Sequence, residues 1–145
     1  MMTTVRQLLQ SKGNTVLSVA PEASVFEALE LMARYDVGAL LVLSGPNLVG
    51  IFSERDYARK IILVGRSSRE TLVREVMTGD LITITPDATV GDCMNAMTSN
   101  RIRHLPVVEH GQLVGVISIG DVVKAIMSQQ QFMITELEAY ITGSR

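Results

Sequence analysis

The chain has 145 residues, of which 47% are hydrophobic and 19% are charged, and its formal net charge is -2 at pH 7. This composition is typical of a soluble globular protein, and the absence of a basic excess together with few aromatic residues argues against nucleic-acid binding. No apolar run approaches the roughly 20 residues of a membrane span, and the N-terminus lacks the apolar core of a secretory signal. We therefore expect a cytoplasmic protein without a membrane partner.

The first predicted elements are a short helix, a short strand and a second helix. Residues 2–11 have apolar side chains at helical spacing, and residues 16–19 form a strand candidate that ends at Pro21. Ser24 followed by Glu27 is the pattern of a capping box, in which the two side chains satisfy backbone amides at a helix start. The helix that follows carries one apolar stripe, made of Val25, Ala28, Leu29 and Met32.

A hairpin and another helix are predicted next. Residues 39–43 and 48–53 are apolar strand candidates, and the four residues between them are turn formers. A helix is then expected from near Glu54 to Val64, where Gly65 ends it. The order of this unit is β-α-β-β-α.

The same order returns after a polar joint at residues 66–70. A short helical segment at 71–77 precedes a strand at 81–84 and a helix capped by Thr89. The second hairpin is predicted from residues 105–108 and 112–118. The last helix is expected from about Gly120 through Thr142, with an apolar side longer than one domain needs. That side is either a partner surface or a face that folds back on its own domain, and the sequence leaves both open.

The second half of the chain repeats the first at an offset of 65 positions without a gap. LVGIFSERD at 48–56 returns as LVGVISIGD at 113–121. Two copies of about 60 residues would each be marginal alone, so we expect one pseudosymmetric module with a shared core. Identities in this alignment include Pro21/Pro86, Val25/Val90, Met32/Met97, Val42/Val107, Gly50/Gly115, Ser53/Ser118 and Asp56/Asp121.

This repeat resembles the CBS domain pair, or Bateman module, and is most similar to its stand-alone bacterial and plant-organelle members. Each copy has the family's hydrophobic-x-Pro entry and its Gly-hydrophobic-hydrophobic-Ser-x-x-Asp ending, and residues 76–78 resemble the Val-Met-Thr lead-in. The resemblance implies an α+β fold, with two pseudosymmetric β-α-β-β-α repeats packed through their sheets. The expected division is a lead-in helix at 1–14, repeat one at 15–65, a linker with a short helix at 66–79, repeat two at 80–127 and a C-terminal helix extension at 128–145.

The resemblance implies a regulatory sensor of adenine nucleotides and not an enzyme. AMP, or else ATP, ADP or NAD, would bind as a regulatory ligand in clefts between the repeats, with no catalytic cofactor. The module would form a disc-like homodimer and would act on an unknown regulated protein. The alternatives are a ligand-free interaction or scaffold module, or a module for NAD(H), ATP or S-adenosylmethionine.

The family's ligand-binding positions map onto both repeats. The ribose-binding aspartate corresponds to Asp56 and Asp121, and the phosphate-side hydroxyl corresponds to Ser53 and Ser118. Basic residues at the positions of Arg103 and His104 reach phosphates in nucleotide-binding relatives. The adenine ring would lie against backbone and small side chains, expected here at Ala20, Val37, Ala39, Thr85 and Ile102.

The chemistry of these residue types also suits the binding of a sugar phosphate. A serine at a strand end and an aspartate three residues later share a corner with unpaired helix amides, which suit a phosphate. An ionised carboxylate only accepts hydrogen bonds, so it can take both ribose hydroxyls. The same residues can also be ordinary helix caps, a reading that the spacing alone favours.

Charge distinguishes the two repeats. Arg101 and Arg103 flank Ile102 before the second hairpin, where repeat one has YDVGA, and Arg55 stands opposite Gly120. We assign Arg55 and Arg101 to phosphate on chemistry alone, because a guanidinium matches phosphate geometry, although each can be a solvated charge. His104 is as readily a structural histidine. We expect one preferred nucleotide site and one weaker site.

Other chemistries have no motif in this chain. It lacks a P-loop, a G-x-G-x-x-G loop, a His-Glu-x-x-His helix and a cysteine cluster, and two histidines offer little to a metal. The single cysteine, Cys93, cannot form an internal disulfide, which suits a reducing compartment, and it is expected to be buried.

Overall fold

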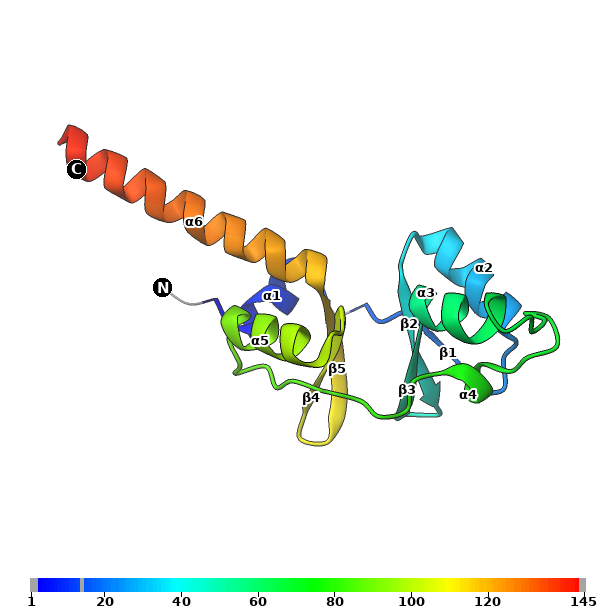
Figure 1. Cartoon of the computed structure of the whole chain (residues 1–145). Helices are drawn as coiled ribbons and strands as arrows, with labels where there is room; N and C mark the ends of the chain where they lie inside the picture. Colours follow the sequence, from blue (N-terminus) through cyan, green and yellow to red (C-terminus); the bar gives the residue numbers. More distant parts are fainter. Residues whose placement is uncertain (1–2, 14, 144–145) are drawn as a thin grey trace. The chain divides into compact units, whose positions relative to one another are not determined.

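The computed structural model describes residues 3–13 and 15–143 of an α+β chain that divides into two compact units (Figure 1). We call Thr15–Ile82 the central unit, and Met1–Asn14 with Thr83–Arg145 the terminal unit. The central unit contains β1 (Ser18–Val19), α2 (Val25–Tyr35), β2 (Ala39–Ser44), β3 (Asn47–Ser53), α3 (Glu54–Tyr57), the π-helical turn η1 (Ala58–Ile62) and α4 (Val73–Val76). The terminal unit contains α1 (Val5–Lys12), α5 (Val90–Asn100), β4 (His104–Glu109), β5 (Gln112–Ser118) and α6 (Ile119–Thr142).

The central unit is built on a three-stranded sheet in the order β1-β2-β3. β1 runs parallel to β2, and β2 and β3 form the predicted antiparallel hairpin. The Ser24 hydroxyl accepts a hydrogen bond from the Glu27 N–H and begins α2, which is the serine half of the predicted capping box; the return bond from the Ser24 N–H to the Glu27 side chain does not form within the described residues. The apolar stripe of α2 is buried against the sheet and α4, in a core of Val25, Ala28, Met32, Leu40, Val42, Phe52, Ile61, Val73 and Val76.

The helix predicted over residues 54–64 is interrupted. It is α-helical only to Tyr57 and then widens into η1, where the Leu63 N–H donates to the Ala58 carbonyl. Bonds five residues apart replace the α-helical bonds in that turn, and Gly65, with φ of 73°, ends the segment in the left-handed region. The equivalent segment of the terminal unit remains α-helical.

The terminal unit repeats the hairpin but not the third strand. β4 and β5 pair with the same register and the same bulge as β2 and β3. The strand predicted at 81–84 is wrong, since only Ile84 forms an isolated parallel bridge, with Val107. The reason is Pro106: its counterpart Leu41 donates its N–H to the Leu17 carbonyl, whereas proline has no N–H to donate.

Each unit also contains the lead-in helix that precedes the other repeat in the sequence. α1 precedes repeat one but bonds to repeat two, and α4 precedes repeat two but bonds to repeat one. The two attachments are equivalent at a spacing of 68 residues, which differs from the 65 of the repeats. They are Val5 N–H to Ala88 and Arg6 N–H to Pro86 for α1, and Val73 N–H to Ala23 and Arg74 N–H to Pro21 for α4.

The long C-terminal helix forms as predicted, from Ile119 to Thr142. Its first turns bury Val122 and Ala125, and Gln129 bonds to Thr3. Farther along, Leu137 is 59% exposed and Tyr140 is 84% exposed, so this part of α6 does not fold back on its own unit. In the part of the chain that the structure describes, no helix has the length and apolarity to cross a bilayer.

Candidate functional site

Both Ser-x-x-Asp motifs form the same local corner at the start of a helix. Ser53 ends β3 and caps α3, and Ser118 ends β5 and caps α6. In each corner the serine Oγ accepts the N–H of the aspartate at 3.2 Å, and the aspartate Oδ2 accepts the N–H of the serine. The capping role that spacing favours is therefore confirmed in both repeats, and the ligand role stays a prediction.

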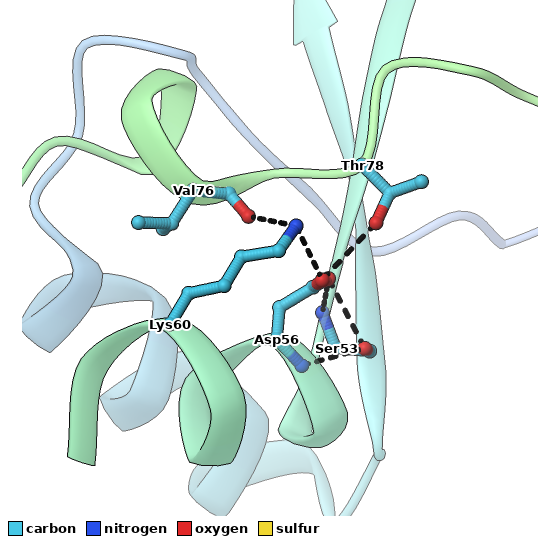
Figure 2. A network of polar contacts seen from close by, with 5 residues as sticks. All are labelled: Ser53, Asp56, Lys60, Val76 and Thr78. Atoms are coloured by element: carbon cyan, nitrogen blue, oxygen red, sulfur yellow. Dashed lines mark hydrogen bonds and ion pairs between the residues drawn. The ribbon is translucent and has the colours of Figure 1, made fainter. Parts of the chain in front are cut away.

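In the central unit the carboxylate of Asp56 is fully engaged (Figure 2). Its Oδ1 accepts the Thr78 hydroxyl at 3.0 Å and pairs with Lys60 Nζ at 2.9 Å. Its Oδ2 accepts both the N–H and the Oγ–H of Ser53, at 3.0 and 3.1 Å. A carboxylate has about four lone-pair positions, so this group has no capacity left. Asp56 is 7% exposed.

In the terminal unit the carboxylate of Asp121 is only half engaged. Its Oδ2 accepts the Ser118 N–H at 2.8 Å and Lys12 Nζ at 2.5 Å. Its Oδ1 has no hydrogen-bond partner among the residues that the structure describes, and the side chain is 24% exposed. One oxygen of this corner is therefore available to a donor from outside.

Lys12 comes from α1 and also donates to the Val116 carbonyl at 2.9 Å. Burial raises the pKa of Asp121, but the hydrogen bond and charge of Lys12 and the bond from the Ser118 N–H outweigh it and hold the pKa below its usual value. Asp121 is therefore ionised at neutral pH and is already paired with a cation.

The partners of the two aspartates were not assigned from the sequence. Repeat two has Ala125 at the position of Lys60, and Lys12 supplies the cation from 109 residues away. The sequence does contain a signal for these partners. The segments that precede the two repeats, which we call the lead-ins, share a short motif: Thr-x-Val-Arg at 3–6 returns at 71–74. Its spacing of 68 residues does not fit the main repeat.

The structure brings part of the predicted basic cluster to the Ser118 corner. His104 begins β4 and is the Cα partner of Ser118, and the Arg103 carbonyl accepts the Ile119 N–H at 2.8 Å. Arg103 is exposed, and within the described residues its side chain has no polar partner. Arg101 instead ends α5 in the left-handed region, with φ of 54°, and Arg55 is exposed in the short α3.

The residues predicted to hold the adenine ring lie in both units, in or next to the strands of each repeat. Ala39 is the Cα partner of Ser53, whereas Val37 packs against the core of the central unit. Ile102 follows the end of α5 and is half-buried. Ala20 and Thr85 are exposed, each immediately before a buried proline. Their role in binding a ring stays a prediction.

No metal-ligand cluster accompanies these corners. Within residues 3–13 and 15–143, no three His, Cys, Asp or Glu side chains are grouped to hold an ion. Cys93 is buried in α5 as expected, and burial raises the pKa of its thiol to about 11. A thiol with that pKa is protonated and unreactive at neutral pH.

Comparison with known proteins gives consistent matches along the chain. The family model described as CBS domain matches residues 5–63 and 73–128. The chain is 41% identical over 150 residues to the CBS domain-containing protein CBSX3, mitochondrial, of Arabidopsis thaliana, covering 97% of this chain and 73% of that protein. It is 44% identical to a crystal structure of a CBS domain, NE2398, with a TM-score of 0.84, covering 88% of this chain and 99% of the other.

A more distant structure shares the fold alone. It is the CBS domain pair of protein MJ0100 in complex with 5′-methylthioadenosine and S-adenosyl-L-methionine, 22% identical with a TM-score of 0.77. The match covers 89% of this chain and 99% of that chain. The Arabidopsis relative and the NE2398 structure are named for CBS domains alone, in agreement with the prediction of a non-enzyme.

Proposed function

Because the chain belongs to the CBS-domain family and carries two copies of the domain, we propose that it is a regulatory module for an adenosine ligand, with AMP as the first candidate. The observation that carries this proposal is the half-open carboxylate of Asp121 beside Lys12, at the start of a 24-residue helix. A carboxylate acceptor, a cation and a helix N-terminus are the groups that a ribose phosphate needs.

We assign the ribose to Asp121, whose Oδ1 can accept a sugar hydroxyl without losing an existing bond. Gly120 has no side chain over the first turn of α6, so an anion can approach the helix amides closely. Lys12 pairs with Asp121, and Arg103 adjoins the start of α6 through its carbonyl, so both can pair with phosphate, with His104 opposite Ser118. Arg101, at the end of α5, has a lesser role in this arrangement.

The corner of the central unit is the weaker site. A ribose could bind Asp56 only by displacing Thr78, Lys60 or Ser53, each of which already bonds to it. Displacing a buried, charge-assisted bond costs about 1.5–3 kcal/mol before any gain from the ligand. This difference supports the expectation of one preferred site and one weaker site.

The identity of the ligand is the finer part of the proposal. The complex of MJ0100 shows that this fold accommodates adenosine compounds, but at 22% identity it does not choose among them. The cations around Asp121 favour a ligand with phosphate, which ranks AMP, ADP, ATP and NAD above S-adenosylmethionine. The rival function, a ligand-free scaffold, would leave the open oxygen of Asp121 to solvent.

A thermal-shift panel of AMP, ADP, ATP, NAD and S-adenosylmethionine tests the proposal, because a ligand that binds only the folded state raises its stability. We expect Asp121→Ala to abolish the shift given by the best ligand and Asp56→Ala to preserve it. Asp92→Ala is the matched control, since Asp92 forms the same capping box with Thr89 away from the site. The absence of a shift with every compound at millimolar concentration would refute nucleotide binding.

We further propose that the module acts as a homodimer and passes ligand binding to an unknown regulated protein in the cytoplasm. Ligand binding can change a partner's affinity only if the ligand binds one state of the module more tightly than another. The long exposed helix α6 is the element that supports an interaction role. The compartment is supported by the single cysteine, which cannot form an internal disulfide, and the mitochondrial name of the Arabidopsis relative makes organelle fractionation the direct check.

A further inference from the structure

Helix α6 has an exposed apolar stripe with the spacing of a coiled coil. Its members alternate at intervals of four and three residues over almost five turns, which is the a/d pattern of a helix that pairs with another helix. The exposure of its apolar members ranges from 43% at Val123 to 80% at Ile141, so this unit does not cover the stripe. The stripe consists of Val123, Met127, Gln130, Ile134, Leu137 and Ile141.

Two further exposed apolar residues widen the stripe on one side. Met133 and Tyr140 each precede a stripe residue and are 61% and 84% exposed. On the other side, Lys124 and Glu138 each follow a stripe residue and are exposed. Within the described part of the chain, neither of these two charges belongs to an ion pair, so both are available to a partner.

We propose that the stripe of α6 pairs with the α6 stripe of a second copy of this chain in antiparallel orientation. In that register Val123 packs against the partner copy's Ile141, Met127 against Leu137 and Gln130 against Ile134. The same register sets Lys124 of each copy beside Glu138 of the other, at two equivalent places related by the two-fold axis. The interface is about 27 Å long, from 1.5 Å per residue.

Charge selects this arrangement over a parallel one. A parallel pair would place Glu138 beside Met133 and would gather the acidic residues of both copies at one end. An antiparallel pair neutralises both charges and also opposes the two helix dipoles. A lipid surface is disfavoured as the occupant, since a membrane-binding amphipathic helix has a Lys/Arg-rich polar face, and the exposed half of α6 has Glu136 and Glu138 instead.

Ile134→Glu against Phe132→Glu is the matched test in the full chain. The two residues are 48% and 50% exposed and lie two positions apart, hence on opposite faces of α6. We expect Ile134→Glu to raise the dissociation constant of the dimer at least about 100-fold, because it buries two unpaired carboxylates. Phe132→Glu should leave it unchanged. Sedimentation equilibrium measures both, and circular dichroism checks the helix.

Charge reversal then tests the orientation. Lys124→Glu and Glu138→Lys should each weaken the dimer by about tenfold, because each turns two exposed attractions into repulsions. The double variant should restore wild-type affinity. The two residues lie about 21 Å apart on one helix, so only an antiparallel pair can couple them.

The outcomes separate this interface from the proposed homodimer itself. A dimer that survives Ile134→Glu refutes the α6 interface and leaves the homodimer intact. A wild-type chain that is monomeric at every attainable concentration refutes both. A double charge variant no tighter than the single variants refutes the antiparallel orientation.

Discussion

The carboxylate of Asp56 is held by a lysine, a threonine hydroxyl and both donors of Ser53, while that of Asp121 is held by a lysine and one backbone amide. These aspartates occupy equivalent positions of the repeat. Each has a lysine partner, and the difference arises from the Thr78 hydroxyl and the Ser53 hydroxyl, which both donate to Asp56. The carboxylate of Asp56 therefore has no acceptor capacity left for a ligand, whereas that of Asp121 keeps one oxygen available.

Asp56→Ala should destabilise the protein more than Asp121→Ala. Removing the buried carboxylate of Asp56 leaves the Thr78 and Ser53 hydroxyls without this acceptor and leaves Lys60 with only the Val76 carbonyl, at a cost of about 3 kcal/mol. Removing the half-exposed Asp121 should cost about 1 kcal/mol, since Lys12 can turn to water. Urea denaturation of the two variants measures the difference, and equal losses would contradict the contrast drawn from their contacts.

Lys12→Met should lower stability at neutral pH and not in acid. A carboxyl with a lowered folded-state pKa contributes stability above its unfolded pKa of about 3.9, and that contribution is lost as pH falls through the folded value. Lys12 lowers the pKa of Asp121, so its removal should cost about 1 kcal/mol near pH 7 and almost nothing once Asp121 is protonated. Denaturation as a function of pH measures this, and the pH-dependent part of the effect should vanish in an Asp121→Asn background, which leaves the bond of Lys12 to the Val116 carbonyl.

At the level of the elements, the packing of α1 against β5 requires a glycine in that strand. A Cβ at Gly115 would lie 2.7 Å from Leu9 Cδ2, and a Cβ at Gly50 would lie 2.6 Å from Met77 Sδ. Leu9 and Met77 are equivalent residues of the two lead-ins. Each repeat therefore keeps a glycine where the lead-in of the other repeat crosses its hairpin, and this explains why Gly50 and Gly115 are identical.

Gly115→Ala should destabilise the protein by about 1–3 kcal/mol, as an added methyl group does in a packed core. The double variant with Leu9→Ala should lose less than the sum of the two single losses, because the smaller side chain removes the clash. Gly91→Ala in α5 is the control, since its Cβ would meet nothing closer than 3.6 Å, and it should stabilise by about 0.5 kcal/mol. Additive losses at positions 9 and 115 would contradict the contact.

For the whole molecule, the lead-ins mean that each unit combines one repeat with the lead-in helix of the other, and that the terminal unit is made of two separate stretches of the chain. The terminal unit joins the two ends of the chain, since Val5 and Leu9 are buried with a repeat more than 70 residues away. Arg6 pairs with Glu109 and Asp87, and their carboxylates raise the pKa of its guanidinium, mainly through the bond to Glu109. The start of the chain therefore supports the second repeat.

Deleting residues 1–12 should accordingly weaken β4 and β5 and leave β2 and β3 protected. The deletion removes two buried apolar side chains, the backbone bonds to Pro86 and Ala88, and the lysine on Asp121. Native-state hydrogen exchange resolves such regional differences. Loss of protection first at residues 39–53 would show that α1 supports the first repeat instead.

Local patterns account for most of the secondary structure. Serine and threonine caps, apolar stripes at helical spacing and turn residues between apolar runs predict α2, α5, α6 and both hairpins, since each depends on residues within one or two turns of each other. The same reasoning failed at residues 81–84, where Pro106, 22 residues later, removes a donor from the bridge. It also missed the widened turn at Ala58–Ile62.

The sequence by itself determined that the chain is a tandem repeat with a Ser-x-x-Asp corner in each copy, because identity at a constant offset and capping chemistry can both be read without coordinates. Only the tertiary structure decided which corner is open. That depends on Lys12 reaching Asp121 across 109 residues and on Thr78 reaching Asp56 across 22. Contacts at such separations follow from how lead-ins and repeats pack, and neither the 65-residue repeat nor the helical and strand periodicities encode them.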